Sequence, residues 1–188
     1  AEFAAHIVKV NLQHDFAKNL KGNITLAHGD YDKLYQNFFA SDYTPATNIV
    51  QLDGYVDTIQ RKRLTLASNL VGELATGNVK HTIIGGIEFI DTSNNNDRFN
   101  PVFSSTGNDR ETFIATRPLS FRGGTGINAA GEAVTMTFSD VNDRTEAEVQ
   151  VTSLYLQDEI EVNQYVDLLL GARFDRFEID VTDKRDVT

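Results

Sequence analysis

The stretch that decides the fold is residues 63–89, which read RLTLASNLVGELATGNVKHTIIGGIEF. From Leu64 to Leu74, four leucines fall on even positions, so that they share one face, while polar residues take much of the other. Alternation with a period of two is typical of a β-strand whose two faces meet different surroundings. Gly77 and Asn78 interrupt the pattern, and it resumes over Lys80–Phe89. We therefore expect an antiparallel hairpin.

The same alternation outlines two further hairpins. One joins Val8–His14 to Asn23–Ala27 through residues 15–19, and the other joins Glu148–Ile160 to Val166–Phe174 through residues 161–164. Each connection contains an Asn or Gly, which tolerates the backbone angles of a turn. The sequence thus predicts six strands in three hairpins.

The connections between the hairpins are long. They are expected to be loops over Asp30–Asp53 and Asp91–Glu146. Loops of this length are uncommon in a compact domain and tend to be functional or disordered. Within the second loop, Phe113–Phe121 and Ala133–Phe138 are expected to pair as a small hairpin. Short turns would then alternate with long loops along the chain.

The amino-acid composition disfavours or excludes several classes of protein and of functional site. The chain has 188 residues, with 17 basic and 27 acidic side chains and a net charge of −10. It contains no run of about 18 apolar residues that could form a spanning helix. Its acidity disfavours a nucleic-acid partner. The absence of cysteine excludes disulfides, zinc–thiolate sites and thiol catalysis. No secretion signal is visible after Ala1. Residues 183–188 are mostly charged and show no turn or cap, so we expect a truncation there rather than a natural end.

Two fold classes fit the alternation. In a transmembrane β-barrel, strands of about ten residues alternate between lipid and lumen, with short turns at one end and long loops at the other. In a soluble antiparallel sandwich, the strands alternate because one face packs on a core. The pattern alone leaves both open, although long strands with charged residues on the non-apolar face favour the barrel.

Three segments carry a resemblance to the barrels of TonB-dependent outer-membrane receptors. Residues 153–161 followed by 168–177 resemble a strand–turn–strand of these barrels. Residues 77–88, which read GNVKHTIIGGIE, resemble a hairpin of the ferric-siderophore branch. Residues 10–20 resemble a third hairpin. The three occur in this order, which makes the resemblance more specific than any one of them.

The resemblance implies active import of a ferric siderophore through the outer membrane of a Gram-negative bacterium. Its implied partners are the iron chelate, the TonB energy-coupling system acting through a plug domain, and outer-membrane lipid. Receptors of this kind have barrels of about 22 strands with a plugged lumen. We therefore expect residues 1–188 to be a middle part of such a barrel, an all-β, antiparallel, up-and-down segment of about six strands without the plug. The alternative function is a soluble β-rich binding module that uses its aromatic loops.

The alternation also predicts which way the side chains face. Ten apolar residues should face lipid: Val8, Val10, Leu12, Leu64, Leu66, Ile83, Ile87, Leu168, Leu170 and Phe174. Nine polar residues should face the lumen: Lys9, Asn11, Gln13, Arg63, Asn69, Glu73, Glu88, Arg173 and Asp175. After Asp175 the apolar residues Phe177, Ile179 and Val181 change parity, so that either a β-bulge or the exit from the membrane is expected there.

The loops hold the residues predicted to bind the ligand. Arginine supplies charge and forked donors, and aromatic rings supply stacking surface, both of which suit an anionic, flat-ringed chelate. The alternative for each residue is packing within the loops or a place in the aromatic girdle. The candidates are Tyr31, Tyr35, Phe38, Phe39, Arg98, Arg110, Arg117, Phe121 and Arg122.

Other motifs predict no chemistry. Residues 91–97 alternate oxygen-bearing side chains, as a calcium loop does, but Asn96 and Val102 stand where the glycine and bidentate Glu are needed, so a solvated polar loop is expected. Residues 124–129 match a dinucleotide-binding spacing without the βαβ context, so a turn is expected. The four histidines lack metal-ligand spacing, and no catalytic set is suggested. We expect no enzyme activity, no cofactor and no resident metal.

Overall fold

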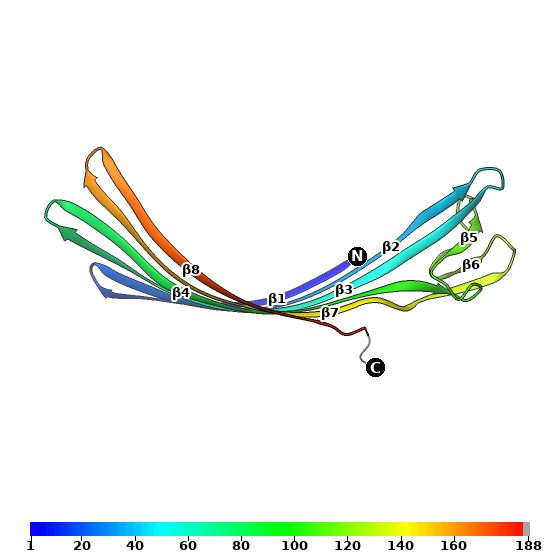
Figure 1. Cartoon of the computed structure of the whole chain (residues 1–188), viewed down its shortest axis with the longest axis horizontal. Helices are drawn as coiled ribbons and strands as arrows, with labels where there is room; N and C mark the ends of the chain where they lie inside the picture. The colour runs from blue at the N-terminus through cyan, green and yellow to red at the C-terminus, as the bar shows by residue number, and fades with distance from the viewer. Residues whose placement is uncertain (186–188) are drawn as a thin grey trace.

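The computed structural model describes residues 1–185 and shows one antiparallel sheet (Figure 1). Its strands follow one another across the sheet in the order β1-β2-β3-β4-β7-β8, with two short strands, β5 and β6, added at one end. The strands are β1 (Glu2–Ala17), β2 (Leu20–Thr44), β3 (Ile49–Thr76), β4 (Val79–Phe103), β5 (Glu111–Ile114), β6 (Thr125–Ile127), β7 (Ala133–Asn163) and β8 (Val166–Asp183). Among these residues, no helix has the length and apolarity needed to cross a bilayer.

The three predicted hairpins are confirmed. β1 pairs with β2, β3 with β4, and β7 with β8, all antiparallel. Their turns are tight and lie together at one end of the sheet (Figure 1). The middle turn has Gly77 at a φ of 65°, a left-handed conformation that glycine adopts without strain. The predicted all-β, antiparallel, up-and-down class is therefore correct. On the described strands the sheet is open, because β1 and β8 each pair on one side only.

The first predicted long loop is wrong. Asp30–Asp53 is almost entirely strand, because β2 continues to Thr44 and β3 begins at Ile49. Only residues 45–48 form the turn between them. The apolar–polar alternation is weak in this stretch because it is rich in aromatic and charged residues. The two strands nevertheless keep one register except for a shift between Ala40 and Asp42.

The second predicted loop is shorter than expected. β4 runs on to Phe103 and β7 starts at Ala133, so the connection is residues 104–132. The small hairpin predicted within it has different partners. β5, which contains Phe113, pairs with β3, and β6 pairs with the start of β7. The polar segment 91–97 is likewise part of β4 rather than a solvated loop. The turn predicted over residues 124–129 is found only in part, because Gly123 and Gly124 have positive φ but Thr125–Ile127 form the short strand β6.

The predicted facing of the side chains agrees with the strand register. Leu66 lies opposite Leu26 and Phe89, and Leu26 lies opposite Val10. Directly paired residues share a face, so all ten residues predicted to face lipid lie on one side of the sheet. We call this side the Leu66 face. The nine residues predicted to face the lumen lie on the other side, which we call the Arg63 face.

The character of both faces reverses along the strands. From the turn end up to about Leu64, the Leu66 face is mainly apolar, although it also carries His14, Arg176 and the His81–Asp158 pair. Beyond that level this face carries Asp30, Lys62, Glu148 and Asp180 in one row. On the Arg63 face the change is opposite. Polar rows give way to rows that hold aromatic, aliphatic and basic side chains, including the following: Phe177, Ile179, Val181, Val149, Val151, Ile7 and Tyr31.

This reversal accounts for the change of parity in β8. The bulge offered as one explanation is wrong, because β8 pairs with β7 without a register shift from Asp167 to Asp183. The strand continues straight, and its apolar residues move to the opposite face. The other predicted explanation, an exit from the membrane at this level, stays a prediction.

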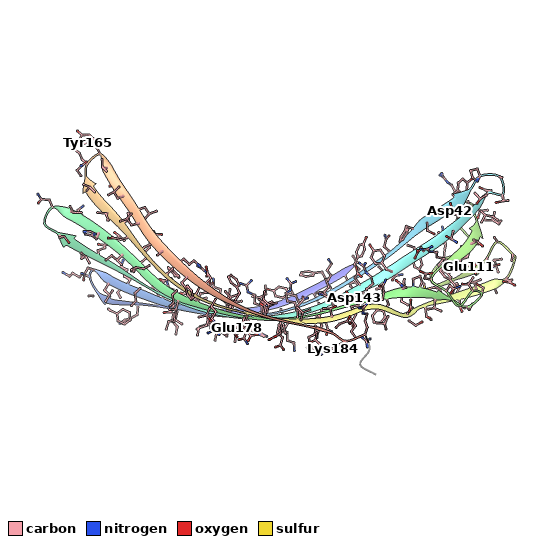
Figure 2. All side chains as sticks on the ribbon, viewed as in Figure 1. Asp42, Glu111, Asp143, Tyr165, Glu178 and Lys184 are labelled. Atoms are coloured by element: carbon pink, nitrogen blue, oxygen red, sulfur yellow. The ribbon has the colours of Figure 1, made fainter. Side chains whose placement is uncertain are left out.

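The sheet is a single layer, with side chains standing on both sides of it (Figure 2). Large apolar side chains of the Leu66 face are therefore exposed, such as Leu12 at 66%, Leu154 at 52% and Phe174 at 64%. The buried core is small and lies at the loop end. Its residues are Val50, Leu52, Phe103, Phe113, Phe121 and Val134, and we call this group the loop core.

The loop core orders the connection between β4 and β7. The rings of Phe113 and Phe121 lie 5.1 Å apart, and Phe103 lies 5.5 Å from Phe121. Nearby, the buried carboxylate of Glu111 accepts hydrogen bonds from the Thr112 amide and the Ser105 hydroxyl. These contacts hold residues 104–132 against the ends of β3 and β7, so the segment is a folded cap rather than a free loop.

A cluster of polar side chains occupies the Arg63 face nearer the turns. Arg173 Nη2 donates to Glu88 Oε2 at 3.1 Å and to the buried Ser153 Oγ at 2.9 Å, and Arg173 Nε donates to Asp175 Oδ1 at 2.8 Å. The Tyr155 ring lies beside this guanidinium, 5.8 Å from ring centroid to Cζ. The hydroxyl of Tyr155 passes over Gly86, where a Cβ would come within 2.8 Å of the Ser68 carbonyl oxygen.

The close approach at Gly86 leads to a testable difference between neighbouring glycines. Gly86→Ala is expected to destabilise the sheet by about 1–3 kcal/mol, because the added methyl overlaps backbone as well as Tyr155. Gly85→Ala is the control, since its Cβ would meet nothing nearer than Leu156 at 3.5 Å. Urea unfolding of the two variants measures the difference, and equal midpoints would contradict the packing at Gly86.

Candidate ligand-binding face

The candidate site is the part of the Arg63 face beyond the reversal, where aromatic and basic side chains of β2, β3 and β4 gather. The pairing of the strands places Tyr35, Asp57 and Arg98 in one row. Each belongs to a long strand: Asp57 and Arg98 are paired with strands on both sides, and Tyr35 is paired with β3. This placement on strands is the main difference from the long loops that the sequence predicts.

Arg98 is fixed by three contacts. Its Nε donates to Asp57 Oδ1 at 2.6 Å, and its Nη2 donates to Asp57 Oδ2 at 2.8 Å. Its guanidinium also lies over the Tyr55 ring, 4.6 Å from the centroid. Tyr55 in turn lies 5.9 Å from Tyr35, ring to ring. Two aromatic rings and an oriented cation therefore form one continuous surface.

The ion pair keeps Arg98 charged. Hydrogen bonding to Asp57 raises the pKa of the Arg98 guanidinium above its ordinary value. Because Asp57 occupies the Nε side in a bidentate pair, the charge is largely balanced, so Arg98 contributes orientation and a flat stacking surface more than net charge.

Arg110 reaches the same region from the loop. Its Nε donates to Asp53 Oδ2 at 3.0 Å, and Asp53 lies opposite Phe39 in β2. Phe39 remains 42% exposed. Of the nine predicted ligand-binding residues, five thus belong to this face: Tyr31, Tyr35, Phe39, Arg98 and Arg110.

The other four predicted residues are not brought to this face. Phe121 is buried in the loop core and Phe38 packs against it, with 5.8 Å between the ring centroids. Packing within the loops, the alternative considered for each candidate, is what the structure shows for these two. Arg117 and Arg122 are exposed on the connection between β5 and β6.

The sequence pattern does not single out Tyr55, Asp57 or Arg61 as ligand-binding residues, and it predicts Arg63 only as a lumen-facing residue. Tyr55 and Asp57 fix Arg98, and Arg61 lines a hollow below it together with Lys33 and Arg63. The signal was the alternation of residues 53–63, where every second residue is aromatic, aliphatic or charged. This alternation belongs to β3, which starts at Ile49 and therefore includes residues 53–63.

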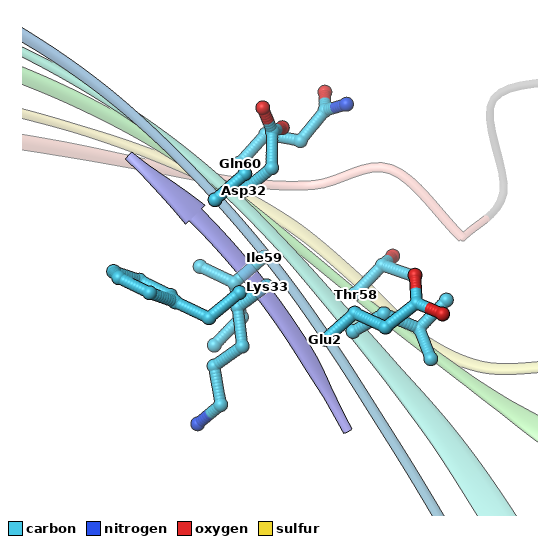
Figure 3. A pocket seen from close by; sticks show the side chains of 9 residues that line it. Glu2, Asp32, Lys33, Thr58, Ile59 and Gln60 are labelled. Carbon is cyan, nitrogen blue, oxygen red and sulfur yellow. The ribbon is translucent and has the colours of Figure 1, made fainter. Parts of the chain in front are cut away.

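A hollow near the start of β1 is not part of the site. It measures about 390 Å³, and its lining comes from both sides of the sheet. Lys33 and Ile59 project from one side of the strands, and Asp32 and Gln60 from the other (Figure 3). A ligand cannot contact both sets through the sheet. A separate hollow of about 420 Å³ lies wholly on the Arg63 face, lined by Phe3, Tyr31, Lys33, Ile59, Arg61 and Arg63.

No group of three His, Asp or Glu side chains within residues 1–185 could hold an ion. The closest His–carboxylate contact is His81 Nδ1 to Asp158 Oδ2 at 2.8 Å, a simple pair near the turns.

The fold and this face define a class of protein: an open wall of long, up-and-down antiparallel strands with an apolar band on one side. The chain belongs to the family of TonB dependent receptor-like β-barrels, whose model matches residues 2–188. This agrees with the resemblance carried by the three hairpin motifs.

Solved receptors share the fold. The ferric-catecholate import receptor Fiu from Escherichia coli K12 superposes with a TM-score of 0.68 at 15% identity, over 96% of this chain and 24% of its own. FpvA from Pseudomonas aeruginosa, solved with bound pyoverdine and iron, gives 0.73 at 16%, over 95% and 22%. The siderophore receptor PiuA from Acinetobacter baumannii gives 0.66 at 23%, over 96% and 26%.

The chain therefore spans about a quarter of the length of these receptors. At these identities the likeness concerns the fold. No curated protein sequence matches the chain.

Proposed function

We propose that this chain forms part of the wall of a closed receptor barrel that imports a ferric siderophore across the outer membrane of a Gram-negative bacterium. The ligand would be captured on the upper Arg63 face, around Tyr35, Tyr55 and Arg98. Release would then follow through the lumen, driven by the TonB system acting on a plug domain. The observation that carries the proposal is the reversal of both faces at one level of the sheet.

The height of the apolar band supports a membrane-spanning wall. From Leu64 to Leu74 the strand rises about 33 Å, which is about 25 Å along the barrel axis at a tilt of about 40°. That matches the apolar band of outer-membrane barrels, which is about 25 Å tall. Below the reversal, lipid would meet the apolar Leu66 face and water the polar cluster around Arg173. Above it, water would meet the charged Leu66 face, and the Arg63 face would line the ligand chamber.

The soluble binding module is the weaker alternative. A soluble sheet has to bury its apolar face against a second layer. In residues 1–185 the loop core is the buried hydrophobic cluster, and it lies at the end of the strands instead of over the rows of leucine. Membrane fractionation separates the two: a receptor is recovered with outer membranes and migrates differently in gels unless boiled, whereas a soluble module is not.

Ligand capture is tested by uptake of radioactive iron. Cells that depend on the receptor carrying this chain are supplied with a panel of ferric siderophores. Tyr35→Ala is expected to reduce uptake of the transported chelate by several-fold, because one ring of the stacking surface is lost.

The matched control is Gln36→Ala, which changes the next residue of β2 on the opposite face. It should leave uptake unchanged. If no ferric siderophore enters by this receptor, the transport proposal fails. If uptake occurs but Tyr35→Ala behaves like Gln36→Ala, the receptor is a transporter whose ligand lies elsewhere.

A further inference from the structure

The basic residues of the Arg63 face are distributed unevenly. Lys9, Arg63, Arg61 and Lys33 occupy four successive rows, at and just above the level where the faces reverse. The positions paired with them on β1 to β4 are Ala27, Thr65, Ile90, Ile7, Gly29, Thr92, Ala5, Tyr31, Asn94, Phe3, Ile59 and Asn96. None of these carries a carboxylate, although the chain has ten more acidic than basic side chains.

The carboxylates in the nearest rows of this face on β3, β4 and β8 are already occupied. Asp57 pairs with Arg98 one row above, and Asp53 pairs with Arg110. Below, Glu88 and Asp175 share Arg173. By contrast, within residues 1–185 no carboxylate lies within ion-pair distance of the four basic residues, and Arg61 Nε donates instead to the neutral Asn94 Oδ1 at 3.0 Å.

Three of the four cations converge on one hollow. Lys33, Arg61 and Arg63 line the cavity of about 420 Å³ together with Tyr31, Phe3 and Ile59. That volume falls in the range of small-molecule sites. The Tyr31 ring folds over Gly29, where a Cβ would lie 2.7 Å from its hydroxyl oxygen, so the ring forms a wall beside Arg63.

We infer that this hollow is an anion-binding subsite, which makes the receptor select ferric chelates that carry net negative charge over neutral ones. The inference rests on the proposed function and specifies its substrate class. Guanidinium and ammonium groups that line one hollow without a carboxylate repel one another, and an anionic ligand removes that repulsion. Arginine forks suit carboxylate or catecholate oxygens, and the rings of Tyr31 and Phe3 offer stacking surface to an aryl ring.

Binding to the purified, intact receptor tests the inference. The two probes are a trianionic ferric tris-catecholate and a neutral ferric tris-hydroxamate. The unmodified protein is expected to bind the anionic complex at least tenfold more tightly, and its Kd should rise with salt concentration. Arg61→Gln and Arg63→Gln should each weaken anionic binding by about 10- to 100-fold, the effect of losing a charged hydrogen bond.

Lys62→Gln is the matched control, because it removes a charge between the two arginines on the opposite face of β3. It should leave binding within about twofold. Equal affinity for both complexes, a Kd insensitive to salt, or an equal effect of Lys62→Gln would overturn the inference while leaving transport intact. Binding of neither complex, with no uptake of any ferric siderophore, would instead count against the proposed function. The salt series needs no variant, so a misfolded mutant does not block the test.

Discussion

Replacing Leu70 with arginine is expected to prevent the receptor that carries this chain from assembling stably in the outer membrane. Leu70 lies in a middle row of the apolar band, 49% exposed, and is flanked by Gly22 and Gly85 on the neighbouring strands. An arginine fits there sterically but would face hydrocarbon. The cost of a cation at the bilayer midplane of a barrel is about 2–4 kcal/mol. The measurement is the fraction recovered in outer membranes as the heat-modifiable form.

The control for this prediction is Val71→Arg. Val71 is the next residue of β3, is also apolar, and lies on the Arg63 face opposite Lys21 and Ile84. An arginine there would enter the lumen, where water can solvate it. Assembly of Val71→Arg should remain close to that of the unmodified receptor. If both variants assemble equally well, the Leu66 face does not meet lipid and the soluble alternative regains support.

Replacing Phe113 with alanine is expected to release the folded cap. Phe113 is fully buried among Phe103, Phe121 and Val50, and it anchors β5 against the end of β3. Truncation of a buried phenylalanine costs about 3–5 kcal/mol. The loop core is small, so this loss would be most of the stability of residues 104–132. Hydrogen exchange of that segment in the intact receptor should increase, while exchange of the strands near the turns stays slow.

Ile114→Ala provides the comparison. Ile114 is the adjacent residue of β5 but is 39% exposed, so its truncation removes little packing. Exchange in residues 104–132 should remain as in the unmodified protein. Protection that is unchanged in both variants would mean that β5 and β6 are held by backbone pairing alone, without the loop core.

Sequence and structure agree best where one face meets a uniform environment. The hairpin of residues 63–89 is predictable because all four leucines from Leu64 to Leu74 fall on one parity, and its turn at Gly77 is where expected. Beyond about the level of Leu64, the sequence does not predict the strands, because charged and aromatic residues alternate there. Charged and aromatic residues occur in loops as well as in strands, so the sequence predicts Tyr31 and Tyr35 in a loop although they lie in β2.

The candidate site was likewise predictable from the sequence only in part. The sequence predicts aromatic and arginine residues as a group, and the structure places five of them on one face. Their separation from Phe38 and Phe121 depends on which side of a strand each falls, and on the packing of a segment that returns from residues 104–132. The alternation of residues within one strand does not reveal the contact between Phe38 and Phe121, which are far apart in the sequence.

The sequence by itself determined the class of the sheet, its three hairpins and the two faces of its lower half, because each follows from a period of two within one or two adjacent strands. The tertiary structure decided how far the strands run, where the faces reverse, and which charges remain unpaired. Those features depend on the register between strands far apart in the chain. Arg98 pairs with Asp57, and Arg61 donates to the neutral Asn94, because β3 and β4 pair in one register along their shared length.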